Sequence, residues 1–231
     1  MSNQILLVSS NTIDNIFDDK GRLIRQQPGG PARYCLSVLQ IENIPYFLLT
    51  QNNIQVNIIV KKEGEQVKVF NQKTRTIPSQ YLDYGHILIS PVSNEWSLKN
   101  LDYSKNIYID IQGYVRKQGE YDAKKIFLPP NRFEPFCIKS SESEIKYLSK
   151  TLINHQIKKC LIITKGEKGA QIYYQSKLFK IKPSEIVCSQ DTIGAGDTFF
   201  AHFIAHFVLT KNPKKSGEYA ARKVIEFLKH K

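Results

Sequence analysis

Short segments with the apolar pattern of β-strands recur through the first 70 positions: residues 5–9 form an apolar run, and residues 56–60 and 67–70 alternate with the period of two that is typical of half-buried strands. Turn-forming residues interrupt this pattern at 18–21 (DDKG) and at 63–65 (EGE), and each interruption predicts a hairpin. The segments with a strand pattern are residues 5–9, 13–17, 23–25, 46–50, 56–60 and 67–70.

Helical spacing of apolar residues first appears after Pro28-Gly29-Gly30 and ends near Asn43 and Pro45. From residue 87 onward, short apolar strands alternate with segments of helical pattern, which predicts a mostly parallel sheet covered by helices. The predicted strands here are residues 87–90, 107–110 and 161–164, and the predicted helices are 95–101, 142–153, 195–209 and 217–228.

These elements predict an α/β sandwich in a single domain that spans residues 1–231. The hairpins of the N-terminal half are expected to form a small, reduced lid from parts of roughly 12–28 and 54–72. No apolar run reaches the length of a membrane span, and the N-terminal segment is too short and too soon polar for a signal peptide, so a cytoplasmic protein is expected.

The formal net charge is +12, from 33 Lys and Arg against 21 Asp and Glu. The basic residues are scattered rather than interleaved with aromatic residues, which argues against a nucleic-acid partner and is compatible with an anionic nucleotide substrate. The cysteines show no spacing typical of a zinc site or a disulfide framework, so free buried thiols are expected. They are Cys35, Cys137, Cys160 and Cys188.

The strongest chemical signal is the segment DTIGAGD at residues 191–197, which runs directly into an apolar helix. Gly194 and Gly196 allow consecutive backbone N–H groups to point into one concavity, and the helix N-terminus adds partial positive charge, so a transferring phosphoryl group could bind there. Asp197, in the first helical turn, could accept the proton of an attacking hydroxyl. A glycine-rich turn with acidic residues that favour the helix dipole explains the same pattern without chemistry.

All fixed positions of this segment match the signature D-T-x-G-A-G-D of the PfkB carbohydrate kinases, and the chain resembles that ribokinase-like family. The resemblance implies a three-layer α/β sandwich with a mostly parallel central sheet and a small β lid. It also implies a phosphotransferase with an alcohol group as acceptor, in which Asp197 is the catalytic base and Gly194, Ala195 and Gly196 form an anion hole. ATP is the implied phosphoryl donor, and Mg²⁺ is the implied metal.

Asp14 and the pair Gly29-Gly30 extend the resemblance to the side of the site that binds the acceptor. The Asn that often follows these glycines in the family is replaced here by the segment PARY at 31–34. The segment DIQGYVR at 110–116 resembles one found in the nucleoside and inositol kinase branches. Arg116 in this segment could pair with a phosphate, while an ordinary surface salt bridge is the expectation from base rates.

The segment TKGEKG at 164–169 follows a predicted strand and resembles the family's turn on the nucleotide side. Residues 139–144 (KSSESE) resemble the family's N-x-x-E element, with Ser141 in place of Asn and Glu144 matching the acid linked to magnesium. A helix N-cap at Ser141 with Glu144 as its capping-box partner explains the same residues. The implied nucleotide-binding residues are Thr164, Gly166, Gly169 and Thr192.

Together these features predict an ATP-dependent kinase that phosphorylates a hydroxyl of a sugar, cyclitol or nucleoside. The alternative is a catalytically silent ribokinase-like binding or regulatory protein, which would keep the fold without the reaction. The presence of Asp197 favours the enzyme. The expected partners are a nucleotide and a polyol or nucleoside acceptor, and a homodimer is left open as the assembly.

Overall fold

The computed structural model of the protein describes residues 4–61, 64–70, 72–187, 189 and 191–231. Residue 63 of the second predicted turn, parts of the predicted lid segment 54–72, and Cys188 lie outside these residues. The strands are β1 (Ile5–Phe17), β2 (Leu23–Gly29), β3 (Tyr46–Lys61), β4 (Gly64–Val69), β5 (His86–Ser90), β6 (Asn106–Asp110), β7 (Cys137–Ser141), β8 (Cys160–Thr164), β9 (Ala170–Tyr174) and β10 (Lys177–Ile181). The helices are α1 (Pro31–Ile41), α2 (Gln112–Val115), α3 (Lys150–Ile157), α4 (Ala195–Thr210) and α5 (Pro213–Lys229), with 3₁₀ turns η1 (Ser79–Tyr81), η2 (Ile145–Tyr147) and η3 (Gly166–Lys168).

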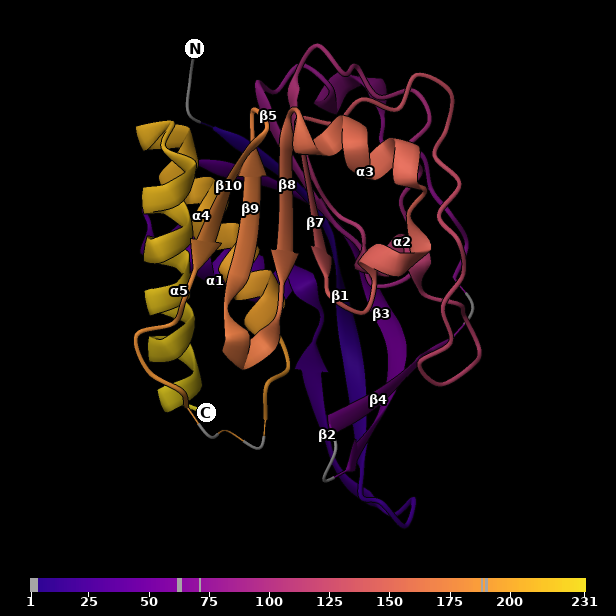
Figure 1. The fold of residues 1–231 in the computed structure, drawn as a ribbon. Helices are drawn as coiled ribbons and strands as arrows, with labels where there is room; N and C mark the ends of the chain where they lie inside the picture. Colours follow the sequence, from indigo (N-terminus) through magenta and orange to yellow (C-terminus); the bar gives the residue numbers. More distant parts are fainter. Residues whose placement is uncertain (1–3, 62–63, 71, 188, 190) are drawn as a thin grey trace.

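One ten-stranded sheet runs through the described part of the chain, in the order β10-β9-β8-β7-β6-β5-β1-β3-β4, with β2 paired to β1. The strands from β8 to β3 in this order pair in parallel, and the pairs that flank them are antiparallel. Helices α1, α4 and α5 cover one face of the sheet, and α2 and α3 lie on the other face (Figure 1). The predicted three-layer α/β sandwich with a mostly parallel central sheet is confirmed.

Alternation along the central strands divides the apolar core between the two faces. Ile5 and Leu7 of β1 pack with Phe200 of α4 on one face, whereas Leu6 and Val8 belong to a second cluster on the opposite face. Because both faces are covered, the central strands read as continuous apolar runs rather than as alternating patterns.

Strands β1 and β3 are longer than predicted, because each continues from the central sheet into the N-terminal hairpin region as one strand. Their parallel register shifts between Ser10 and Thr12. Beyond this shift, β1 and β3 pair with the antiparallel strands β2 and β4, and Ile16 and Ile58 pack in a separate apolar cluster. These strands project past the helices at the bottom of Figure 1, where a lid was expected.

The predicted helix at 95–101 is wrong, because polar bonds hold this segment as a turn. The Glu95 carboxylate accepts hydrogen bonds from the backbone N–H groups of Val92 and Ser93, at 2.7 and 2.6 Å. The Trp96 indole N–H donates to the backbone oxygen of Ser9 at 3.0 Å, which fastens the turn to β1. Side-chain bonds to the backbone of this kind compete with helix formation.

The predicted helix at 142–153 is shorter and starts later, since α3 begins at Lys150 with Ser149 as its N-cap. The Glu144 carboxylate accepts a hydrogen bond from the Ser141 backbone N–H at 2.7 Å, as in one half of a capping box. The chain then continues as the 3₁₀ turn η2 rather than as an α-helix.

Strands β7, β9 and β10 were not predicted. In β7 only the first two residues are apolar, and the turn between β9 and β10 contains no glycine. Gln175 and Ser176 form that turn with positive φ angles of 49° and 66°, which are more often adopted by Gly or Asn. The predicted helices that became α1, α4 and α5 are confirmed, with α5 beginning earlier, at Pro213 after the N-cap Asn212.

Among the helices of the described chain, none combines the length and the apolar character that a bilayer span requires. Cys35, Cys137 and Cys160 are free and buried, as predicted. Cys137 and Cys160 lie on adjacent strands beneath α4, within the core that supports the site described next.

Candidate active site

A cavity of about 200 Å³ lies where the carboxyl ends of the central strands meet the N-terminal hairpins. Ligands of open parallel sheets collect at this edge. The cavity brings together residues that are far apart in the sequence. Its lining includes the predicted site residues Asp14, Gly30, Thr192, Gly194, Gly196 and Asp197.

Asp197 lies in the first turn of α4, at the wall of this cavity. The hydroxyl of Ser90, the last residue of β5, donates a hydrogen bond to Asp197 Oδ1 at 3.1 Å. Burial raises the pKa of Asp197 to about 6, with a further rise from the Asp110 carboxylate, while Lys139, Ser90 and Arg116 act in the opposite direction. A carboxylate with this pKa can take up a proton near neutral pH.

The N-terminus of α4 presents free backbone donors to the cavity. Gly194 caps the helix in the left-handed conformation, with φ 81°, and no side chain caps it. The Ala195 N–H donates to the Thr192 backbone oxygen at 3.1 Å. The N–H groups of Gly196 and Asp197 have no backbone acceptor within the described residues, as expected in the first turn of a helix. Two such donors suit an anion.

Tyr34 of α1 closes the side of the cavity next to Gly194. A Cβ atom at position 194 would lie 2.5 Å from atoms of the Tyr34 ring, so only glycine fits there. Tyr34 belongs to the segment that replaces the family's usual Asn, and it was not predicted as a site residue. Tyr34 lies within α1, and nothing in the local sequence distinguishes a tyrosine that lines a site from one that only packs.

Asp14 provides a second carboxylate in the lining of the cavity, where the residue is 3% exposed and its side chain accepts a hydrogen bond from the Thr12 hydroxyl. Burial raises the pKa of Asp14, although the Thr12 hydroxyl and nearby arginines lower it in part. Gly29 lies against this carboxylate so closely that a Cβ atom would overlap with it. Gly29 therefore makes room for Asp14, whereas Gly30 lines the cavity itself.

Arg116 lines the cavity, so the expected surface salt bridge is wrong. It directly follows the short helix α2, and its guanidinium donates to the Val92 backbone oxygen at 2.9 Å. Gln112, the first residue of α2, lines the same wall. This segment follows β6, so the sheet edge places an arginine and an amide beside the two carboxylates.

Thr164, Gly166 and Gly169 lie in a neighbouring turn rather than in the cavity lining. Thr164 ends β8 and pairs with Ser141 of β7, while Gly166 and Gly169 have positive φ angles of 57° and 85° around η3. Thr192, in contrast, lines the cavity. The predicted nucleotide-side residues thus divide between the strand ends and the loop that leads into α4.

Glu144 is buried beside the end of β7, with 6% of its surface exposed. One of its oxygens accepts the hydrogen bond from Ser141 already described. Within the described ranges, no three His, Cys, Asp or Glu side chains form a group that could hold a metal ion.

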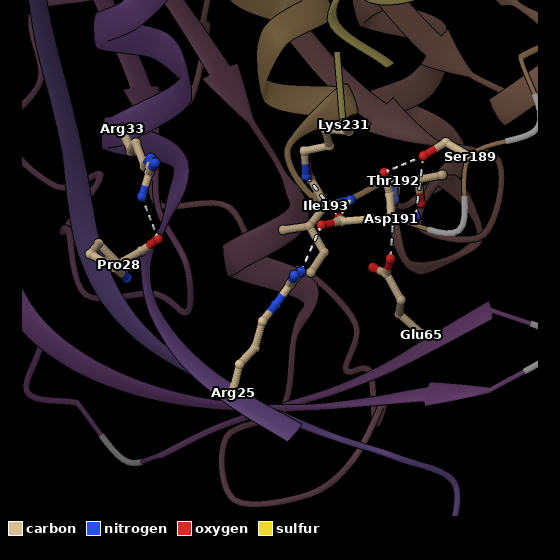
Figure 2. Close-up of polar contacts among 9 residues, drawn as sticks. All are labelled: Arg25, Pro28, Arg33, Glu65, Ser189, Asp191, Thr192, Ile193 and Lys231. Carbon is tan, nitrogen blue, oxygen red and sulfur yellow. Dashed lines mark hydrogen bonds and ion pairs between the residues drawn. The ribbon is translucent and has the colours of Figure 1, made fainter. Parts of the chain in front are cut away.

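Charged residues from distant elements hold the loop that leads into α4 (Figure 2). Asp191 accepts hydrogen bonds from Arg25 of β2 at 3.0 Å and from Lys231 Nζ at 2.8 Å. Lys231 Nζ also donates to the Ile193 backbone oxygen at 2.7 Å. Burial by itself would raise the pKa of Asp191, but these cations and the hydrogen bonds outweigh it and lower the pKa.

Strand β4 contacts the same loop through Glu65, whose carboxylate accepts the Thr192 backbone N–H at 3.3 Å (Figure 2). Burial raises the pKa of this glutamate. Ile193 packs against the apolar cluster of the N-terminal hairpins. Polar and apolar contacts from β2, β3 and β4 therefore meet the loop that precedes the candidate anion site.

The sequence is similar to those of known kinases. The family described as pfkB family carbohydrate kinase matches residues 123–223. The cytidine kinase of Thermococcus kodakarensis is 30% identical over 191 residues, which cover 74% of this chain and 66% of that protein, just under two thirds of its length.

Solved structures with the same fold cover nearly the whole chain. A pyrophosphate-dependent kinase in the ribokinase family, complexed with a pyrophosphate analog and myo-inositol, aligns with a TM-score of 0.74 and 15% identity over 97% of this chain and 95% of its own. Ribokinase of Arabidopsis thaliana, complexed with ribose and ATP, aligns with a TM-score of 0.73 and 15% identity over 99% and 93%. Residues 123–223 are thus similar to the pfkB family of carbohydrate kinases, and the chain as a whole has the fold of the ribokinase-family structures.

Proposed function

We propose that the protein transfers a phosphoryl group from a nucleotide to a hydroxyl of a sugar, cyclitol or nucleoside. The observation that carries this proposal is that one cavity joins Asp14 and Asp197 beside the N-terminus of α4. A carboxylate that binds hydroxyls, a carboxylate that accepts a proton and an anion site are the parts that such a transfer needs.

Asp197 is the proposed general base. The acceptor hydroxyl would lie against this carboxylate and give up its proton as its oxygen attacks the phosphoryl group. A pKa of about 6 leaves Asp197 largely ionised at neutral pH and still able to receive the proton. The hydrogen bond from Ser90 orients the carboxylate toward the cavity.

The transferring phosphoryl group would face the first turn of α4. There the free N–H groups of Gly196 and Asp197 and the helix dipole favour negative charge. Gly194 and Ala195 complete this anion hole by their shape, because the Ala195 N–H is engaged by the Thr192 oxygen. Developing charge is stabilised best by donors that are already in place.

The acceptor is proposed to be a neutral polyol or the ribose of a nucleoside. Asp14 can accept hydrogen bonds from hydroxyls and would repel a second anion. Arg116 and Gln112 also line the cavity and can donate hydrogen bonds. The cavity of about 200 Å³ is smaller than the roughly 300–1,000 Å³ typical of ligand pockets, which favours a single small ring inside it. The 30% identity with a cytidine kinase makes cytidine the first nucleoside to test.

The donor is proposed to be ATP with Mg²⁺. Thr192 and the turn that contains Thr164, Gly166 and Gly169 lie at loops where nucleotide phosphates could bind. Glu144 is the proposed protein ligand for the metal. Pyrophosphate is the second donor to test, because one protein of the same fold is described as pyrophosphate-dependent.

Residues 1–231 are proposed to act as one kinase domain, with parts of roughly 12–28 and 54–72 as its lid. Contacts from Arg25 and Glu65 to the loop before α4 support this role, because they link the hairpins to the anion site. A lid that closes over the acceptor would exclude water from the transfer.

A panel assay tests the proposed function. Purified protein is incubated with Mg²⁺ and ATP, GTP or pyrophosphate, and with cytidine, other nucleosides, free sugars and inositols, while donor consumption and phosphorylated product are measured. Acceptor-dependent product formation is expected. Binding of donor and acceptor without product from any pair would overturn the enzyme and favour the catalytically silent binding protein.

A further inference from the structure

Lys139 is a buried cation in the middle of β7. Its side chain is 3% exposed, and Nζ donates to Asp110 Oδ2 at 2.7 Å, where the Asp110 side chain is 1% exposed. The two residues are register partners on the adjacent parallel strands β6 and β7. The other carboxylate oxygen of Asp110 accepts the Gln112 backbone N–H at 3.0 Å. Asp110 is therefore held on both oxygens.

The Lys139 side chain extends toward the N-terminus of α4. Cys137, two positions earlier on the same strand, packs in the core cluster that contains α4, and strand alternation places Lys139 on the same face. A Cβ atom built on Gly196 would lie 3.0 Å from Lys139 Nζ. The ammonium therefore lies next to Gly196, whose backbone presents one of the free N–H groups, and Lys139 is not among the residues that line the cavity.

Fold stability gives no reason for a charge in this position. A buried ion pair loses much of its attraction to desolvation, and apolar residues of similar size often serve stability as well or better. Burial alone would lower the pKa of Lys139, but Asp110, Glu144 and Asp197 together raise it above its usual value, so the ammonium stays charged. Lys139 thus interacts with three carboxylates beside the anion site, and the same three act on Arg116.

We propose that Lys139 is a positioning residue for phosphoryl transfer, whose ammonium, held by Asp110 behind Gly196, supplies fixed positive charge beneath the turn that receives the phosphoryl group. This inference rests on the proposed function of the same site. A fixed charge in a site of low polarity stabilises charge that develops during the reaction without further rearrangement. Lys139 acts through the Gly196 backbone and the Asp197 carboxylate.

Lys139 and Asp110 shift the pKa of the proposed base, Asp197, in opposite directions. The charged groups that act on Asp197 are Asp110, which raises its pKa, and Lys139 and Arg116, which lower it together with the Ser90 hydroxyl. Removing Lys139 should therefore move the acidic limb of the pH–rate profile to higher pH. Removing the charge of Asp110 should move it to lower pH. Substitution of a residue that has only a packing role would leave the acidic limb at the same pH.

Three variants test this inference: Lys139→Met, Asp110→Asn, and the double variant that carries both changes. The double variant removes both charges of the Lys139–Asp110 pair, so neither partner is left charged without the other, and this guards against loss of the fold in the single variants. The matched control is Lys229→Met with Glu185→Gln, which removes a pair at 2.6 Å on the exposed surface. Thermal unfolding monitors the fold, and kcat, KM and the pH–rate profile are measured for each folded variant.

Pyrophosphate binding, measured by titration calorimetry, provides a readout that does not need catalysis. The double variant should bind pyrophosphate roughly tenfold or more weakly than wild type, with kcat lowered by at least the same factor. The control should match wild type. Equal pyrophosphate affinity and equal kcat in the double variant and wild type would overturn the inference, as would single variants whose acidic limbs do not separate. A wild type that binds pyrophosphate through Lys139 but phosphorylates no acceptor would overturn the proposed function alone.

Discussion

Gly29 of β2 lies directly against the carboxylate of Asp14 on β1, so that a Cβ atom at position 29 would overlap with it. The two strands pair antiparallel, with Asp14 opposite Gln27 and Thr12 opposite Gly29. The absence of a side chain at position 29 thus lets the carboxylate remain beside the cavity, where it also accepts the Thr12 hydroxyl.

The first prediction is that Gly29→Ala weakens acceptor binding by displacing Asp14. Overpacking of this kind typically costs about 1–3 kcal/mol, so the acceptor KM should rise roughly tenfold or more while the donor KM changes little. Steady-state kinetics with both substrates varied measures this. The matched control is Gly85→Ala, because a Cβ atom at position 85 meets nothing within 4 Å. Equal acceptor KM values for the two variants would contradict the role given to Asp14.

The second prediction concerns Asp197→Asn, which keeps the size of the side chain but removes its ability to accept a proton. General-base catalysis contributes about 10²–10⁴-fold, so kcat should fall by that order. Calorimetric binding of donor and acceptor should remain close to wild type, because the N–H groups at the start of α4 belong to the backbone. A variant that keeps more than about a tenth of the wild-type kcat would show that Asp197 is not the base.

The third prediction is an acidic limb in the pH–rate profile near pH 6. The base acts in its ionised form, and the pKa of Asp197 is raised to about 6, so kcat should fall as the pH drops through this value and level off above it. Profiles of kcat from pH 4.5 to 9 test this, with stability checked at each pH. The residual activity of Asp197→Asn should lack this acidic limb. If the limb persists in the variant, it arises from the titration of a group other than Asp197.

The fourth prediction is that Arg25→Met loosens the contact between β2 and the loop before α4. The pair of Arg25 with Asp191 is partly exposed, and such pairs are worth little, so the acceptor KM should rise only about two- to fivefold. The effect should shrink at high salt, because salt screens exposed charges. The matched control is Arg22→Met, since Arg22 pairs with Asp18 on the same hairpin. Identical kinetics for the two variants would argue against a lid that acts through Asp191.

The chemical core of the site could be predicted because a single contiguous segment encodes it. The glycines at 194 and 196 and the carboxylate at 197 lie within one turn of each other, and the apolar residues that follow specify the helix that orients them. Local geometry then determines which backbone donors remain free. For the same reason the helix boundaries of α1 and α4 were predicted closely.

The errors occurred where a few residues bond outside their own segment. Glu95 and Trp96 satisfy backbone groups that a helix would otherwise have used, and this turn is held against β1. Arginine is a residue type that usually lies on the surface. Arg116 nevertheless lines the cavity, because it lies in the segment that follows β6. Neither outcome can be read from local propensity, because the deciding partners come from distant strands.

The alternation of strands and helices, the parallel sheet that follows from it, and the glycine-rich entry to α4 with Asp197 could all be predicted from the sequence. Each of these features depends on neighbouring residues and on the period of apolar positions. That Asp14 and Asp197 line one cavity, and that the Lys139 ammonium lies next to Gly196, follows from the tertiary arrangement alone. The strand order and register place these side chains together, and such long-range pairing is set by the packing of the whole sheet rather than by any local segment.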